Sequence, residues 1–213
     1  MSDPDLWMWS ATRTDCLDYY EYILLYVDDC LCISENPKPV ILQVEKYFPI
    51  KPASQGPPKT YPRGTVSKIQ LPNGVHAWAF SSSPYAHEAV KTMEEHLEKV
   101  GKTLISKKPG TPIPTTYSPE LDITLDLIST DAAYYQSLVG ILRWIVELGR
   151  VEIFLEVSLM YYHLALPREG HLDKLFQSFA YLKWKHRAHI VFDPTYPSID
   201  NDYFLGMIGR KIW

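Results

Sequence analysis

The chain has 213 residues, of which 46% are hydrophobic, and a formal net charge of −4. This length and apolar content suffice to bury a sizeable core in one domain or in two small packed units, which excludes a disordered chain. The negative charge argues against a strong independent nucleic-acid binder, because neutralising phosphates requires a surplus of Lys and Arg on one face.

The cysteines and the apolar runs indicate the compartment. The three cysteines are an odd number and have no Cys-x-x-Cys spacing, which predicts neither a disulfide framework nor a zinc site and favours a reducing compartment. There is no signal-peptide pattern and no apolar run of the length that a membrane span requires. We therefore expect an intracellular protein of the cytoplasm or nucleus, without a membrane partner.

The first predicted element follows an irregular, polar lead-in over residues 1–18. Residues 23–27 and 31–33 are rich in β-forming side chains and too short for a buried helix, so they predict two buried strands of a hairpin. Asp28 and Asp29 then fall at its turn.

Two adjacent carboxylates at such a turn need a positive partner. Burying ionised carboxylates costs several kcal/mol each unless a positive charge pairs with them, and no Lys or Arg occurs between Arg13 and Lys38. A divalent metal would serve, since Mg²⁺ binds one or two carboxylates together with water and substrate phosphates. The alternative is a plain polar turn, because Asp is favoured in turns.

The next predicted elements extend to residue 101. A helix over residues 38–47 follows Asn36-Pro37, a typical helix start. Residues 49–64 are rich in proline and predict a loop. Asn73-Gly74 between two β-prone runs predicts a second hairpin over residues 65–81, and the apolar spacing of residues 83–100 predicts a helix ended by Gly101.

The second half of the sequence predicts a small helical bundle. Residues 102–129 contain several prolines and predict a linker loop. Apolar residues then recur at helical spacing over residues 131–147, 152–166 and 171–187. Short connections favour antiparallel neighbours.

The hairpin tetrapeptide Tyr26-Val27-Asp28-Asp29 resembles the catalytic signature of reverse transcriptases, and further matches resemble the polymerase region of copia-type retrotransposon polyproteins. The resemblance extends over most of the chain, and the segments occur in the family's order. They are Asp3-Pro4-Asp5-Leu6-Trp7, Tyr135-Gln136-Ser137-Leu138-Val139-Gly140-Ile141-Leu142-Arg143-Trp144, Glu156-Val157-Ser158, His163-Leu164-Ala165-Leu166-Pro167, Gly170-His171 and Phe179-Ala180-Tyr181-Leu182-Lys183.

The resemblance implies an α+β fold, a partial polymerase palm of β-hairpins and packed helices followed by a small helical thumb-like bundle. The implied boundaries are a lead-in over 1–18, the C-terminal part of the palm over 19–101, a linker over 102–129, the thumb-like region over 130–189 and a C-terminal tail over 190–213.

The resemblance also implies a reaction, RNA-directed DNA synthesis with Mg²⁺ or Mn²⁺. Asp28 and Asp29 would be the metal-binding catalytic carboxylates, with Tyr26 and Val27 beside the primer end or nucleotide. The implied partners are an RNA template and a DNA primer. The basic side chains near the end of the last predicted helix would contact nucleic acid or be merely solvated; they are Lys183, Lys185 and Arg187.

Several parts of such an enzyme are missing from the 213 residues. There is no strand-borne third Asp before the hairpin, no fingers segment and no ribonuclease H region, so these would be partners from the rest of a polyprotein. We therefore expect the chain to be inactive alone. The competing hypothesis is a catalytically dead remnant that acts, if at all, as an interaction module or weak nucleic-acid binder.

Overall fold

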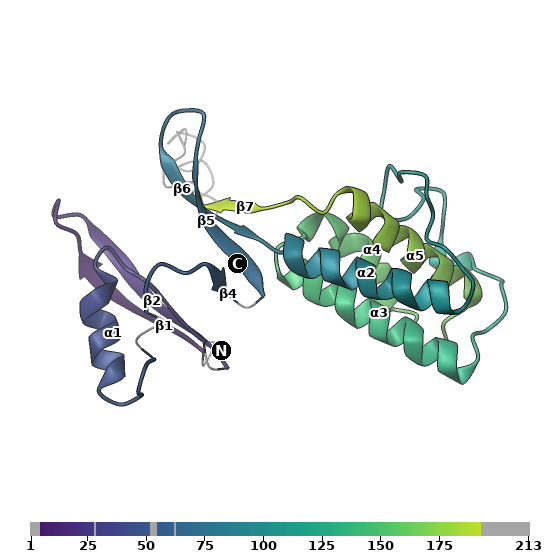
Figure 1. Ribbon diagram of the computed structural model, residues 1–213, viewed down its shortest axis with the longest axis horizontal. Helices are drawn as coiled ribbons and strands as arrows, with labels where there is room; N and C mark the ends of the chain where they lie inside the picture. Colours follow the sequence, from purple (N-terminus) through teal and green to yellow (C-terminus); the bar gives the residue numbers. More distant parts are fainter. Residues whose placement is uncertain (1–4, 28, 52–54, 62, 193–213) are drawn as a thin grey trace, which may run out of the picture.

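The computed structural model describes residues 5–27, 29–51, 55–61 and 63–192. Figure 1 shows three units in a row, which are a first sheet with one helix, a second sheet and a helical bundle. Both sheets are antiparallel, and the helices are mostly segregated into the bundle. The expected α+β class is confirmed.

The first sheet contains the predicted hairpin. Its order is β1 (Leu6–Thr12), β2 (Asp18–Tyr26) and β3 (Asp29–Ile33). β1 pairs with β2 from Leu6 opposite Leu24 to Thr12 opposite Asp18. The expectation of an irregular lead-in over residues 1–18 is therefore wrong for β1, whose large apolar and aromatic side chains suit a pleated surface.

The strands of this sheet are not buried, so the expectation of two buried strands in the hairpin is wrong. Trp7 is 61% exposed and Ile33 is 51% exposed, and no described residue of these strands is buried. The reason is incomplete cover: α1 (Pro37–Glu45) faces one side of the sheet and leaves a groove of about 760 Å³ there, lined by side chains that include Trp9 and Ile23. This unit lacks a closed core.

The second sheet has the order β4 (Thr60–Tyr61), β5 (Gly64–Gln70), β6 (His76–Ser81) and β7 (Ile190–Phe192). The predicted Asn-Gly turn joins β5 to β6, with a φ of 82° at Gly74. β7 lies within residues 190–213, so the expectation of a plain C-terminal tail is wrong for residues 190–192. The physical reason is the edge of β6. Without β7, β6 would expose a row of unpaired backbone groups.

The bundle consists of α2 (Ser83–Lys99), α3 (Ser129–Glu147), α4 (Phe154–Tyr161) and α5 (Glu169–Trp184), with short 3-10 turns at Pro119–Leu121 and Val151–Ile153. Figure 1 shows α2 running beside α3 and α5. No helix in the described part of the chain is long and apolar enough to cross a membrane.

The only hydrophobic core cluster described lies in this bundle. Met93 of α2, Leu142 of α3, Met160 of α4 and Phe179 of α5 are each at most 2% exposed and belong to it. The buried stripe of α2 packs into the bundle and not onto the first sheet, although the predicted boundary after residue 101 groups this helix with that sheet.

Candidate functional site

The acidic tetrapeptide lies at the end of the first hairpin. Tyr26 and Asp29 are paired across β2 and β3, so a two-residue turn connects these strands. Val27 occupies the turn with a φ of 55° and is 93% exposed. Left-handed backbone suits a tight hairpin turn but is unfavourable for a β-branched residue by about 1–2 kcal/mol. Strain of this kind is concentrated at functional sites.

The structure describes one of the two candidate catalytic carboxylates. Asp28 lies outside the described residues. Asp29 is the first residue of β3, one position beyond the turn where both acids were expected, and it is exposed. Among the described residues its carboxylate has no ion-pair partner. An exposed, unpaired carboxylate keeps its hydration and remains available to a cation.

Aromatic residues from other elements surround this end of the hairpin. The ring of Tyr26 lies 6.0 Å from that of Trp144 on α3, measured between centroids, which connects the hairpin to the bundle. Burial and the negative charge of Asp29 raise the pKa of the Tyr61 phenol on β4. This phenol therefore lies near Asp29. The hairpin end is thus the place where the first sheet meets the rest of the chain.

Asp5 is an acidic neighbour that the sequence interpretation missed. Its backbone carbonyl accepts a hydrogen bond of 2.8 Å from the amide of Leu25, so it lies at the same end of the sheet as Asp29. Its negative charge also contributes to the raised pKa of Tyr61. The apolar, aromatic-rich run Leu6-Trp7-Met8-Trp9 was the available signal, since a strand there would place Asp5 just before its start.

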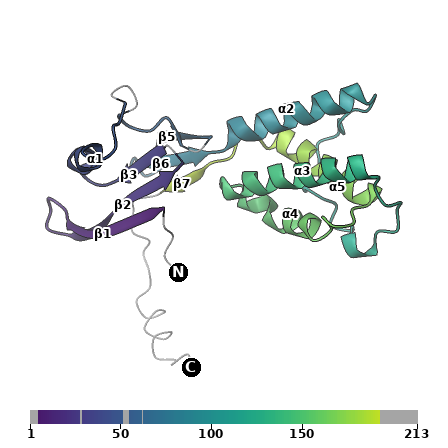
Figure 2. The same ribbon diagram turned by 90° about the horizontal axis from the view of Figure 1, so that it is seen from below.

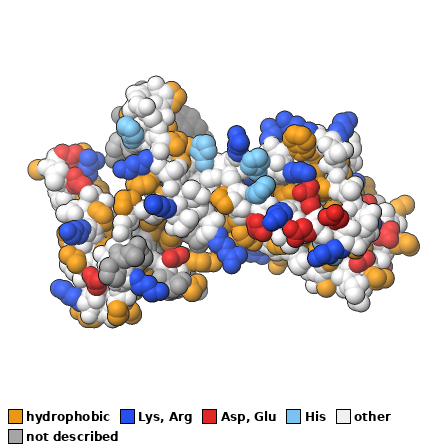
Figure 3. Space-filling model, in the orientation of Figure 1, with side chains coloured by type: hydrophobic (Ala, Val, Ile, Leu, Met, Phe, Trp, Pro, Cys, Tyr) orange, Lys and Arg blue, Asp and Glu red, His pale blue; other side chains and the backbone are white. Residues whose placement is uncertain are grey.

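The basic residues near the end of α5 do not form one helical face. The helix ends at Trp184, so Lys185 caps it and Arg187 lies in the connection to β7. Lys183 is on the helix, but its ammonium is 2.6 Å from the carboxylate of Glu94. On the face drawn in Figure 3, basic side chains over the bundle lie among acidic ones. The expected basic helix face is therefore reduced to two exposed cations beyond α5.

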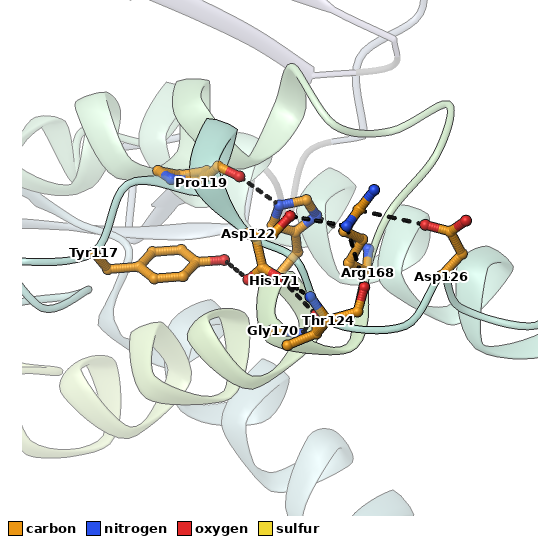
Figure 4. A network of polar contacts seen from close by, with 8 residues as sticks. All are labelled: Tyr117, Pro119, Asp122, Thr124, Asp126, Arg168, Gly170 and His171. Atoms are coloured by element: carbon orange, nitrogen blue, oxygen red, sulfur yellow. Dashed lines mark hydrogen bonds and ion pairs between the residues drawn. The ribbon is translucent and has the colours of Figure 1, made fainter.

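Another polar network lies where the loop before α3 meets the start of α5 (Figure 4). The carboxylate of Asp122 accepts hydrogen bonds from the Tyr117 hydroxyl at 2.6 Å and from the Thr124 amide at 2.9 Å. The Thr124 hydroxyl accepts a hydrogen bond from the amide of Gly170 at 2.9 Å. A Cβ at Gly170 would collide with the Asp122 carboxylate, so only glycine fits there.

His171 completes this network in a single protonation form. Its Nδ1 accepts a 3.0 Å hydrogen bond from the amide of Arg168, and its Nε2 lies 3.0 Å from the carbonyl oxygen of Pro119. An amide can only donate and a carbonyl can only accept, so the ring is neutral with its proton on Nε2. With both nitrogens engaged and 2% exposure, His171 stabilises the fold and is not available for chemistry.

The network predicts a specific loss of stability in acid. Burial raises the pKa of the Asp122 carboxyl, but hydrogen bonds from Thr124 and Tyr117 outweigh burial and lower the pKa to about 2. Because the pKa of an unfolded Asp is about 3.9, the ionised form stabilises the fold above that pH, and this contribution is lost as the pH falls toward 2. We expect the difference in unfolding free energy between the native chain and Asp122→Asn to shrink over that interval. A difference that stays constant would contradict this assignment.

Metal binding by described residues alone finds no support, since among them no group of three or more His, Cys, Asp or Glu side chains is placed to hold a metal ion.

Comparison of the chain with protein-family models, with curated proteins and with solved structures finds no match.

Proposed function

We propose that the chain is part of a copia-type reverse transcriptase, whose parent reaction is metal-dependent RNA-directed DNA synthesis. The observation that supports it is the two-residue turn of β2 and β3, bracketed by Tyr26 and Asp29 of the Tyr-Val-Asp-Asp tetrapeptide. Asp29, the sequence neighbour of Asp28, is exposed to solvent at this end of the sheet. In this reaction a primer 3′-hydroxyl attacks the α-phosphate of a deoxynucleotide and pyrophosphate leaves.

The residues at the turn suit Mg²⁺ or Mn²⁺. Asp28 and Asp29 supply the hard oxygen ligands that these ions prefer, and the exposed position of Asp29 leaves room for water and substrate phosphates. When bound, the ions would stabilise the attacking and leaving oxygens. Tyr26 and Val27 would then lie beside the primer end, with Tyr26 held against Trp144.

In this proposal the first sheet and α1 belong to the last part of a palm, and the bundle is the thumb-like region. The open face of the first sheet and the unpaired outer edge of β3 are consistent with further protein from the rest of a polyprotein covering them. An RNA template and a DNA primer would be the ligands.

The alternative of a catalytically dead interaction module also has an observation in its favour. The described residues provide no complete set of three metal ligands, and two-metal chemistry needs bridging carboxylates from more than one strand. Metal binding at the turn separates this alternative from the first.

The first test is therefore metal binding. We expect Mn²⁺, detected by electron paramagnetic resonance, to bind the chain weakly, and the double variant Asp28→Asn, Asp29→Asn to weaken this binding by about tenfold or more. The matched control removes two exposed carboxylates of α2 through Glu88→Gln and Glu98→Gln, which should leave the binding unchanged. Equal binding in both double variants would contradict the proposed site.

Incorporation of deoxynucleotide on a primed homopolymer RNA tests the reaction itself. The 213 residues alone should give no signal, because the third carboxylate and the fingers that hold the in-line geometry are not among them. Incorporation that the Asp28→Asn, Asp29→Asn variant abolishes would show that the chain is a working enzyme and overturn the expectation of inactivity.

Nucleic-acid contact is a separate prediction. Binding to an RNA–DNA duplex should be weak, independent of sequence and sensitive to salt. The triple change of Lys183, Lys185 and Arg187 to Ala should weaken it, and Lys183→Ala alone should contribute least, because that ammonium is already paired with Glu94. Fluorescence anisotropy at several salt concentrations measures both effects. Affinity unchanged by the triple variant would assign these cations to solvent.

A further inference from the structure

The outward surface of α4 is apolar and open. Phe154 is 61% exposed, Leu155 64% and Tyr162 87%, while Val157 and Met160 on the inner side are buried. A helix that is apolar nearly all round is normally buried all round. Figure 2 shows α4 on the outside of the bundle, with no other described element facing its outer side. The residues of this surface recur at helical spacing and define the α4 face: Val151, Phe154, Leu155, Leu159 and Tyr162.

The surroundings of the α4 face restrict what could cover it. Beside it, between α3 and α4, lies a pocket of about 280 Å³ whose lining includes Val146, Phe154 and Tyr161, a space suited to one aromatic side chain. The charged groups beside it are paired with one another, Glu147 with Arg143 and Glu152 with Arg150. An occupant should therefore be mainly apolar and offer an aromatic side chain to the pocket.

We propose that the α4 face is the docking surface for the last segment of this same chain, residues 203–213. Its sequence is Tyr-Phe-Leu-Gly-Met-Ile-Gly-Arg-Lys-Ile-Trp, which combines apolar side chains with Arg210 and Lys211 and contains no acid. The segment thus has the chemistry that the α4 face calls for, and Trp213 is a candidate for the pocket.

The connection is long enough for this docking. A Cβ at Gly149 would collide with the side chain of Ile190, so the start of β7 touches the residue two positions before Val151. β7 ends at Phe192, about 7 Å further along a strand. The ten residues before Tyr203 can span about 33–36 Å when extended, whereas α4 itself is only about 12 Å long.

Attachment also makes a weak contact sufficient. A short linker gives the second partner an effective concentration in the millimolar range. A dissociation constant of about 0.1 mM for the separate peptide would therefore keep the segment bound most of the time in the intact chain. No residue of the α4 face belongs to the hairpin turn, so the proposal is independent of the proposed reaction.

Tryptic cleavage after Arg210 and Lys211 provides the test in the full chain. If the segment docks, Leu155→Ser should accelerate cleavage at these two sites by about tenfold, because it weakens the contact without disturbing the buried side of α4. Ile123→Ser is the matched control, since Ile123 is 92% exposed on the loop before α3, and it should cleave at the native rate. Equal cleavage of all three chains would overturn the proposal.

Binding in trans provides a second, independent readout. A chain ending at Asp202 should bind the labelled peptide of residues 203–213, and Leu155→Ser should weaken that binding by about tenfold. Hydrogen exchange of the α4 amides should rise on truncation and fall again when the peptide is added. Truncation that leaves the hydrogen exchange of α4 unchanged would overturn the proposal. A dimer in sedimentation would also overturn it if Leu155→Ser dissociates the dimer and truncation does not. In that case the occupant of the α4 face would be a second copy of the chain.

Discussion

Phe179→Ala is expected to lower the free energy of unfolding of the bundle by about 3–5 kcal/mol. Phe179 is fully buried on α5, in the cluster that joins α2, α3, α4 and α5. Its loss removes the transfer free energy of an aromatic side chain and leaves a cavity that the surrounding helices fill only in part. Because small domains are stable by only about 5–15 kcal/mol, this single change would remove a large share of the bundle's stability.

Urea unfolding followed by far-ultraviolet circular dichroism measures this effect. Ile123→Ala is the control in the same unit, because Ile123 is 92% exposed, and its effect should remain within about 0.5 kcal/mol. A Phe179→Ala chain as stable as the control would show that the four helices do not share one core.

Gly170→Ala is expected to destabilise the chain by about 3 kcal/mol, through overpacking and lost hydrogen bonds together. The new Cβ would collide with the Asp122 carboxylate. The Asp122 side chain would have to move away from α5, which breaks the bonds from Tyr117 and Thr124 to this carboxylate.

Gly140→Ala is the matched control for this prediction. Gly140 is exposed on α3, and no atom lies within 4 Å of a Cβ added there. The same chemical change should stabilise that helix by about 0.5–1 kcal/mol, because alanine has the higher helix propensity. Thermal unfolding of the two variants should therefore shift in opposite directions. A shift in the same direction for both would show that backbone propensity and not the collision with Asp122 decides the result.

Local patterns in the sequence predicted the local elements well. The acidic hairpin, the Asn73-Gly74 turn and the helices that became α1, α2 and α3 all have signals within a few consecutive residues, namely β-prone runs, a turn dipeptide and helical spacing of apolar side chains. α5 was predicted over residues 171–187 and spans Glu169–Trp184, because apolar spacing identifies a helix better than it marks the residues where the helix begins and ends.

Features that depend on distant partners were the ones missed. β1 contains no turn dipeptide or polar alternation of its own and is defined by its pairing with β2. β7 is three residues long and exists only because β6 accepts it. The packing partner of α2 follows from three-dimensional fit, since its apolar stripe would suit a sheet or a bundle equally. At the candidate site, a hairpin with two acids near its turn followed from sequence, whereas the pairing of Asp29 with Tyr26 and the nearness of Asp5, Tyr61 and Trp144 did not.

The pairing of β7 with β6 has a kinetic consequence. These two strands flank the bundle in the chain, so every residue of α2, α3, α4 and α5 lies within the loop that their pairing closes. Closing a loop of that length costs entropy that a three-residue strand cannot offset, unless the bundle has already brought its ends together. The second sheet should therefore be completed last in folding, after the bundle. During synthesis, β6 should remain an open edge until residue 192 has emerged.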